Sequence, residues 1–182
     1  MACFGAKYRG GSGVCRTNGR LAQCFLLGTL AWQLHESSGQ GRFAILQTYM
    51  GRRLDELKAV GSYSIASPLN FDFSSSLSLS TTCQHVAIQT QRDMARHDVA
   101  LADCLRQMDL ASVAWELNDA RPISRPEEVK RSRSPSLFKA LFFKVIQFCD
   151  GFDVRVSYAA GKYDDDAVEA LIESWMDSWE SY

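Results

Sequence analysis

The stretch from Phe43 to Phe73 constrains the fold of this chain more than any other. It opens with the apolar run 43–46 directly after a turn rich in Gly and Ser, and a run bounded in this way predicts a buried strand. Gly51-Arg52 interrupts the strand, and a short helix that follows is expected to end at Gly61. Apolar and polar residues then alternate over 69–73, which predicts a half-buried strand.

Length and composition indicate one globular unit. The chain has 182 residues, of which 46% are hydrophobic, and this is enough to bury a core. A net charge of −1 gives no electrostatic reason to expect a nucleic acid or an anionic membrane as partner. No apolar run approaches the roughly 20 residues of a membrane helix. The six cysteines form no CxxC pair and no signal peptide is apparent, so we expect reduced thiols and a cytoplasmic protein.

The N-terminal part divides at residue 17. Residues 1–17 are rich in Gly and basic residues without a period, and we expect a flexible segment there. The glycines at 10–13 lack the frame of a phosphate-binding loop. Residues 18–36 predict a helix that is apolar on most sides, from Leu21 onward, and is therefore buried. We expect His35, at its end, to have a surface or capping role.

The C-terminal half predicts a helix, two strands and a closing helix. A helical face of moderate strength extends to about residue 94, and the polar stretch 116–133 is expected to be a surface loop. Apolar residues up to 148 and the alternating run 153–158 predict a hairpin around Asp150-Gly151. The last helix has a firm amphipathic spacing, with Val168, Leu171, Ile172, Trp175 and Trp179 on one face.

These parts, in this order, resemble the C-terminal half of a nonribosomal peptide synthetase condensation domain. In that family a strand ends in Gly-Arg and is followed by Ile-Gly-x-Phe-Ile-Asn-Thr-x-Pro-Leu. Here Gly51-Arg52 and the run Val60-Gly61-Ser62-Tyr63-Ser64-Ile65-Ala66-Ser67-Pro68-Leu69 stand at the matching distance. The resemblance extends from Asn18 to the C-terminus, which makes residues 18–182 one lobe. It implies an α/β fold, a mixed-sheet α/β sandwich of the chloramphenicol acetyltransferase type.

The family's catalytic motif, His-His-x-x-x-Asp-Gly, does not occur in this sequence. The three histidines, His35, His85 and His97, are isolated from one another. A general base must lie within hydrogen-bond reach of the attacking group, and this chain frames no candidate. The resemblance therefore implies half of an enzyme, without a catalytic residue of its own and inactive when isolated.

The resemblance assigns supporting roles to a few residues. It implies that Arg52 pairs with the Asp of the catalytic motif across the lobe interface. An exposed Arg52 at a helix start is the alternative. Tyr63, Ile65 and Ala66 are expected to line the substrate tunnel, although Ile65-Ala66 replaces the family's polar Asn-Thr pair.

Three other patterns in the sequence could indicate a metal, catalytic or phosphorylation site. Asp164-Asp165-Asp166 is more simply a helix cap than a metal site, because hard cations need carboxylates that converge from different directions. Cys83 and His85 are two positions apart, so on a helix their side chains face apart. Serines 124, 132 and 134 lie near arginines, which is a weak signal for phosphorylation.

The function expected from the resemblance is support of amide or ester bond formation in secondary metabolite biosynthesis. Such an acyltransferase uses a thioester on a carrier protein, and the carrier delivers the phosphopantetheine, so no cofactor is bound directly. The expected partners are an N-terminal condensation lobe and a carrier protein. The alternative is a non-catalytic α/β binding or scaffold module that associates with a partner through the face left by the missing lobe. A self-contained enzyme of another family is disfavoured, because no catalytic set is assembled.

Overall fold

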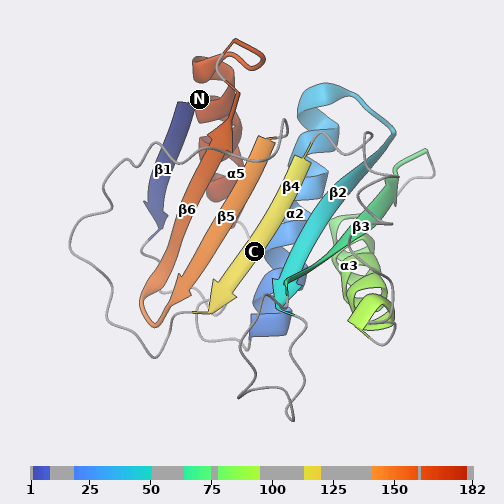
Figure 1. Cartoon of the computed structure of the whole chain (residues 1–182). Coiled ribbons are helices and arrows are strands. Elements are labelled where there is room, and N and C mark those ends of the chain that lie inside the picture. The colour runs from blue at the N-terminus through green and yellow to red at the C-terminus, as the bar shows by residue number, and fades with distance from the viewer. Residues whose placement is uncertain are drawn as a thin grey trace.

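The structure is a computed structural model that describes residues 2–8, 19–50, 64–74, 78–94, 113–119, 141–159 and 161–179. These residues form six strands and three helices (Figure 1). In chain order the elements are β1 Ala2–Tyr8, α2 Gly19–Ser38, β2 Arg42–Met50, β3 Ser64–Asp72, α3 Leu79–Met94, β4 Val113–Asp119, β5 Leu141–Phe148, β6 Gly151–Tyr158 and α5 Asp165–Ser178.

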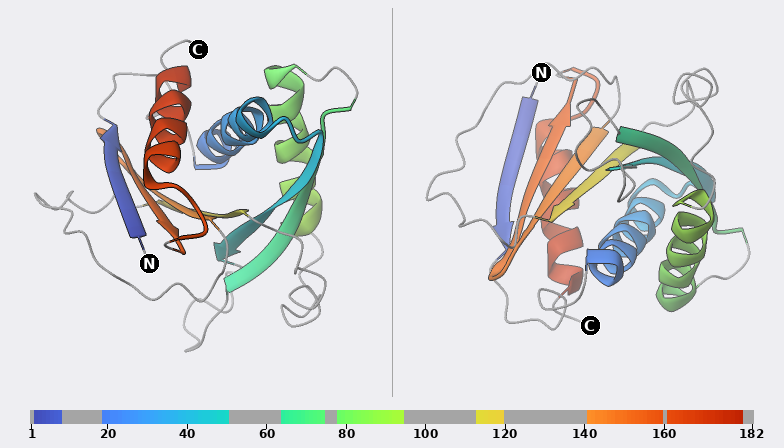
Figure 2. Two further views of the ribbon diagram at one scale, coloured as in Figure 1. Left: turned by 90° about the horizontal axis from the view of Figure 1, so that it is seen from above. Right: turned by 60° about the horizontal axis from the view of Figure 1, so that its bottom comes forward.

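The strands form one mixed sheet with the order β1-β6-β5-β4-β2-β3. The central strands β5, β4 and β2 run parallel to one another, and the outer pairs are antiparallel. Helices α5, α2 and α3 all cover the same face of this sheet, as Figure 2 shows from above and from below. The mixed-sheet α/β class expected from the sequence is confirmed.

Two strands were not foreseen. The expected flexible segment is wrong for Ala2–Tyr8, which pairs along its whole length with β6. The expected loop from residue 116 is wrong for Glu116–Asp119, which continues β4. In both cases pairing with a neighbouring strand supplies the backbone hydrogen bonds that the local sequence does not suggest.

The expected closing helix is confirmed. Asp164 precedes α5, and its carboxylate accepts a hydrogen bond from the backbone N–H of Ala167 at 3.0 Å. The hairpin of β5 and β6 turns at residues 149–150 and is also confirmed. The helix expected over 18–36 is present as α2, but Leu21 is 59% exposed and does not join its buried face. The helix expected before Gly61 lies outside the described residues. No helix among the described residues is long and apolar enough to cross a bilayer.

The core lies between the sheet and the helices and centres on Trp175 of α5. Its indole is fully buried and meets the rings of Trp115 and Phe143 edge to face, with centroids 5.9 and 5.8 Å away. The indole Nε1–H donates to the hydroxyl of Thr29 in α2 at 2.9 Å. The Thr29 hydroxyl in turn donates to the carbonyl of Leu26 at 2.9 Å. One side chain therefore joins α5 to both the sheet and α2.

We predict that Thr29→Val lowers the free energy of unfolding by about 1–3 kcal/mol, because it leaves the buried indole N–H without its acceptor. Trp175→Ala should lower it by about 3–5 kcal/mol, since it also empties the centre of the core. Urea denaturation measures both. Ile88→Ala, at a side chain that is 51% exposed on α3, is the control and should change stability by less than about 0.5 kcal/mol. A Thr29→Val variant as stable as this control would contradict the role of the hydrogen bond.

Helices α2 and α3 approach closely at Gly28. A Cβ added to Gly28 would lie 2.6 Å from the Cys83 sulfur and 3.0 Å from the Cys83 Cα. Burial raises the pKa of the Cys83 thiol to about 11, with a smaller contribution from Cys24. Cys83 therefore packs as a small neutral side chain between the helices. Cys149, in the turn between β5 and β6, is exposed.

We predict that Gly28→Ala destabilises the protein by about 1–2 kcal/mol in denaturant unfolding. An alanine gains roughly 1 kcal/mol of helix propensity over glycine, so the clash has to exceed that gain. The Cys83 sulfur can rotate away, but its Cα is backbone and moves only with α3. Gly41→Ala is the matched control, because nothing lies within 4 Å of its added Cβ. Stabilisation by Gly28→Ala would show that the helices can separate at little cost.

Candidate functional site

The candidate functional site is the face of the sheet that carries none of the described helices. Leu46, Ala66 and Ala114 form a cluster there, from three neighbouring strands, and each is 5% exposed or less. Leu46 lies opposite Ala114 in the ladder, Ala114 lies opposite Phe142, and Phe142 packs against the cluster. We call these four residues the apolar patch.

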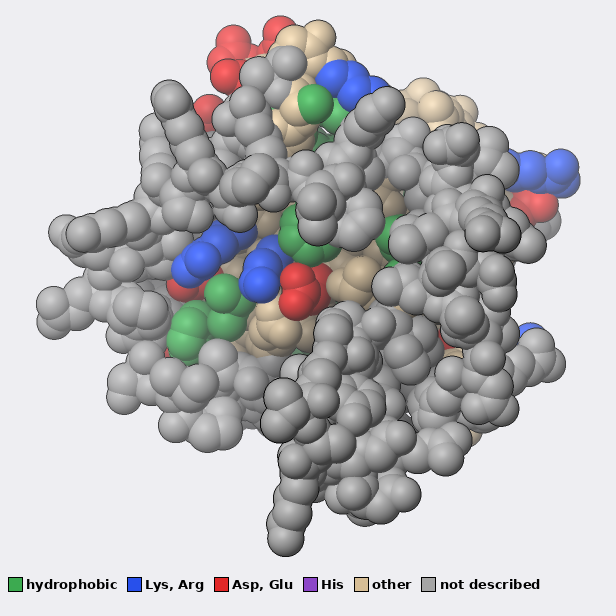
Figure 3. Space-filling model, in the orientation of Figure 1, with side chains coloured by type: hydrophobic (Ala, Val, Ile, Leu, Met, Phe, Trp, Pro, Cys, Tyr) green, Lys and Arg blue, Asp and Glu red, His purple; other side chains and the backbone are tan. Residues whose placement is uncertain are grey.

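A row of charged side chains crosses the same face next to the apolar patch. Glu116, Lys144 and Arg155 lie directly opposite one another on β4, β5 and β6. The Lys144 ammonium is 3.5 Å from the Glu116 carboxylate, and the Asn118 amide donates to that carboxylate at 3.0 Å. Figure 3 shows basic, acidic and hydrophobic side chains side by side on this face. The three residues Glu116, Lys144 and Arg155 are the charged row.

The charged row contains two cations and one anion. Arg155 and Lys144 are directly paired across β5 and β6, where like charges repel. The Arg155 Nε is buried and has no hydrogen-bond partner among the described residues. An acidic group placed over Arg155 would both satisfy this nitrogen and reduce the repulsion. The row is therefore suited to receive a carboxylate, a phosphate or a polarised carbonyl oxygen.

The sequence-predicted site residues are only partly described. Ala66 lies in β3 on the helix-free face, opposite Thr48 in the ladder, and is part of the apolar patch. Ile65 is paired with Tyr49 in the same ladder. Arg52 and Tyr63 lie outside the described residues. The tunnel-lining and interface roles of these residues stay predictions.

Sequence reasoning missed the charged row. A signal for it was present, because Lys144 interrupts the apolar run of β5 and Arg155 is a cation within the alternating strand β6. What the sequence does not contain is the register that brings these residues opposite Glu116, which lies on a strand that was not foreseen.

The two described histidines have structural contacts. The Nδ1 of His35 is 2.8 Å from the carbonyl oxygen of Gln40, and its ring stacks on Phe73 with centroids 4.4 Å apart. The Nε2 of His85 is 2.8 Å from the carbonyl oxygen of Asn70. A carbonyl only accepts, so each of these nitrogens carries a proton and donates it. The expected capping role of His35, next to the end of α2, fits this contact. His97 lies outside the described residues.

The other proposed constellations do not assemble. Cys83 packs against Gly28 of α2, whereas the ring of His85 contacts the strand backbone at Asn70, so the two side chains serve different neighbours. Among the described residues, no group of three or more His, Cys, Asp or Glu side chains could hold a metal ion. The described part of the site can therefore offer charged side chains beside a buried apolar cluster to a ligand or a partner.

Comparison with solved structures shows what this fold is similar to. The starter condensation domain of the rhizomide synthetase RzmA superposes with a TM-score of 0.70 at 14% identity, over 99% of this chain and 45% of that one. The first condensation domain of the calcium-dependent antibiotic synthetase gives 0.70 at 14% identity, over 98% and 44%. The condensation domain of the monacolin K polyketide synthase MokA gives 0.70 at 17%, over 98% and 46%.

These similarities confirm the fold predicted from the sequence. The chain has the fold of one lobe of a condensation domain and spans a little less than half the length of the structures that it matches. No protein-family model and no curated protein sequence matches it. At 14–17% identity the likeness extends to the fold alone.

We predict that Glu116→Gln lowers the free energy of unfolding by about 0.5–1 kcal/mol at low salt, because it leaves Lys144 and Arg155 as adjacent unbalanced cations. The loss should shrink in 1 M NaCl, where exposed charges are screened. Glutamine keeps the oxygen that accepts from Asn118, so the substitution removes charge alone. Glu173→Gln, at an exposed carboxylate on α5, is the control in the same urea titrations. An effect independent of salt would show that the row is not coupled electrostatically.

Proposed function

We propose that this chain acts in the cytoplasm as the C-terminal lobe of a condensation-type acyltransferase. In this role it supports amide or ester bond formation from a thioester on a carrier protein. The observation that carries the proposal is the helix-free face on a half-domain fold, with its apolar patch beside a charged row. A second lobe that docks on this face would pack against the half-buried Phe142 at the edge of the buried patch and supply an acidic partner to Arg155.

In this proposal the chain forms part of the tunnel wall and orients the catalytic loop, and the other lobe supplies the general base. The sequence lacks His-His-x-x-x-Asp-Gly, so the proton of the attacking amine or hydroxyl is taken by a histidine of the partner lobe. Arg52 follows the end of β2 by two residues and would pair with the Asp of that motif, which fixes the catalytic loop. The apolar patch, including Ala66, would form a wall of the tunnel. The carrier protein delivers the phosphopantetheine arm, so this chain binds no cofactor directly.

A non-catalytic binding or scaffold module is the second candidate. The contacts of His35 and His85 with backbone carbonyls favour it, because they give both described histidines a structural role, and the sequence lacks the catalytic motif. In this case the same face binds a partner, and no acyl transfer follows. The two candidates share a surface and differ in whether product forms.

The proposal is tested by mixing the chain with a separately produced N-terminal condensation lobe that carries the catalytic motif. Complex formation is followed by analytical ultracentrifugation, and product release is followed from an aminoacyl carrier thioester. We expect a complex with turnover, whereas neither protein alone should give product. Association without turnover would favour the scaffold candidate. Absence of association would overturn the proposed role as a condensation lobe.

Variants locate the contact surface in the same mixing experiment. Ala66→Arg places a long cation in the apolar patch and should weaken the complex at least tenfold. Ala87→Arg makes the same change on the exposed surface of α3 and is the matched control. Arg52→Ala should leave most of the binding and reduce turnover at least a hundredfold, since it acts on the orientation of the base. Equal effects of Ala66→Arg and Ala87→Arg would place the interface elsewhere.

A further inference from the structure

A cavity of about 610 Å³ opens on the opposite side of the sheet from the candidate site, between α2 and α5. Its floor is made by the first residues of three strands, with Phe43 and Ala44 from β2, Val113 from β4 and Leu141 from β5. The end of α2 and the first turns of α5 form the walls. A volume of this size lies within the range of about 300–1,000 Å³ that is typical of small-molecule sites.

The cavity lies beyond the point at which α2 and α5 are held together, where part of the α5 wall is made by small residues. Trp175 and Thr29 join α5 to α2 deep in the core, and one turn further along α2 the Gln33 amide contacts Ser174. Beyond this pair the α5 wall presents Ala167 and Ala170. These side chains are too short to fill the space above the strand ends. The cavity is thus built into the sequence of the two helices.

Hydrogen-bonding groups stand at one side of this apolar space. The Gln33 Nε2 donates to the Ser174 hydroxyl at 2.9 Å and to the Ser37 hydroxyl at 3.5 Å. Each hydroxyl accepts in these contacts and keeps its own proton for donation. The Gln33 Oε1 accepts no hydrogen bond from the described residues. The group Gln33, Ser37 and Ser174 can therefore donate twice and accept once toward a ligand.

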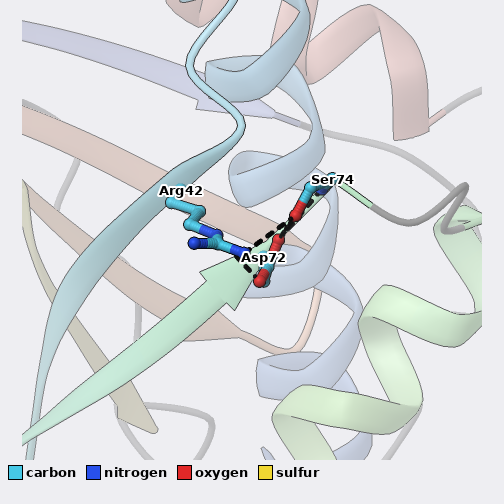
Figure 4. A network of polar contacts seen from close by, with 3 residues as sticks. All are labelled: Arg42, Asp72 and Ser74. Atoms are coloured by element: carbon cyan, nitrogen blue, oxygen red, sulfur yellow. Dashed lines mark hydrogen bonds and ion pairs between the residues drawn. The ribbon is translucent and has the colours of Figure 1, made fainter.

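The Arg42 cation at the mouth is already paired with a carboxylate. The Arg42 Nε donates to the Asp72 carboxylate at 2.9 Å, and Ser74 donates to the same carboxylate through its backbone N–H and its hydroxyl (Figure 4). The hydrogen bonds from Ser74 lower the pKa of Asp72, with the Arg42 charge acting in the same direction. Asp164 lies on the other wall, where it caps α5. An anionic ligand group would therefore meet no unpaired cation among the described residues that line the cavity.

We propose that this cavity is a binding site for an uncharged, mostly apolar small molecule that carries one amide or carbonyl group. The apolar body lies on the strand ends, between Leu141 on the floor and Ala170 on the α5 wall. The carbonyl oxygen accepts from the hydroxyls of Ser37 and Ser174, and an amide N–H donates to the Gln33 Oε1. The site is independent of the proposed condensation function, because it lies on the helix-covered side of the sheet.

Octanamide is a suitable probe, and its binding to the full chain can be followed by the ¹⁵N–¹H NMR shifts of residues around the cavity. We expect saturable shifts at Gln33, Ala167 and Ala170. Octanoate has the same chain with a charged head and should bind at least fivefold more weakly, whereas acetamide lacks the apolar body and should produce no saturable shift. Shifts spread over the whole surface, or octanoate binding as tightly as octanamide, would overturn the assignment.

Variants on α5 separate the cavity from non-specific binding. Ala170→Phe fills the space from an exposed position and should weaken octanamide binding at least tenfold, and Ala167→Leu is a second filling variant. Glu173→Phe places the same ring on α5 away from the cavity and should leave affinity within twofold of the parent. Ser174→Ala removes one donor and should weaken binding about threefold to tenfold. Unchanged affinity in both filling variants, with unfolding curves like that of the parent, would overturn the proposal.

Discussion

The hydrogen bond from Trp175 to Thr29 sets the spacing on which the rest of the structure depends. At 2.9 Å it fixes α5 against α2, and the same indole rests edge to face on the rings of the central strands. Large side chains fill the space on the sheet side of this contact. Toward the start of α5 the cavity wall includes Ala167 and Ala170 beside Val168 and Leu171, and a space remains between α5 and the end of α2. Helices α2 and α5 therefore pack tightly against each other in the core and leave a cavity beyond it.

Elements that bury a face of their own could be predicted from the sequence. Helix α5 repeats its apolar residues at helical spacing and is preceded by Asp164, so its start and its buried side were both predicted. Strand β1 could not be predicted in this way, since Ala2, Gly5 and Ala6 offer no alternation and its hydrogen bonds come from β6, about 150 positions later in the chain. The local sequence pattern is therefore enough to predict a helix such as α5, whereas a strand such as β1 depends on pairing with a distant part of the chain.

The candidate site shows the same division. Ala66 was placed by an extended motif around it, and it lies where a tunnel wall is proposed. Glu116, Lys144 and Arg155 come from three separate strands and meet only through the ladder register. The sequence does not reveal this register. Polar residues in a strand are equally consistent with an ordinary solvent-exposed face. That the three residues form one charged row follows only from the strand pairing in the structure.

The parallel centre of the sheet is the strongest physical reason to connect the helix-free face with a partner. Parallel strands occur almost only where both faces of the sheet are covered, and antiparallel strands tolerate one wet face. Strands β5, β4 and β2 are parallel, and it is their helix-free side that carries Leu46, Ala114 and Phe142. The antiparallel strand β6 contributes Arg155 to that face. The apolar patch, which is largely buried, therefore lies on the parallel strands, where both faces of a sheet are normally covered, and the charged row lies beside it.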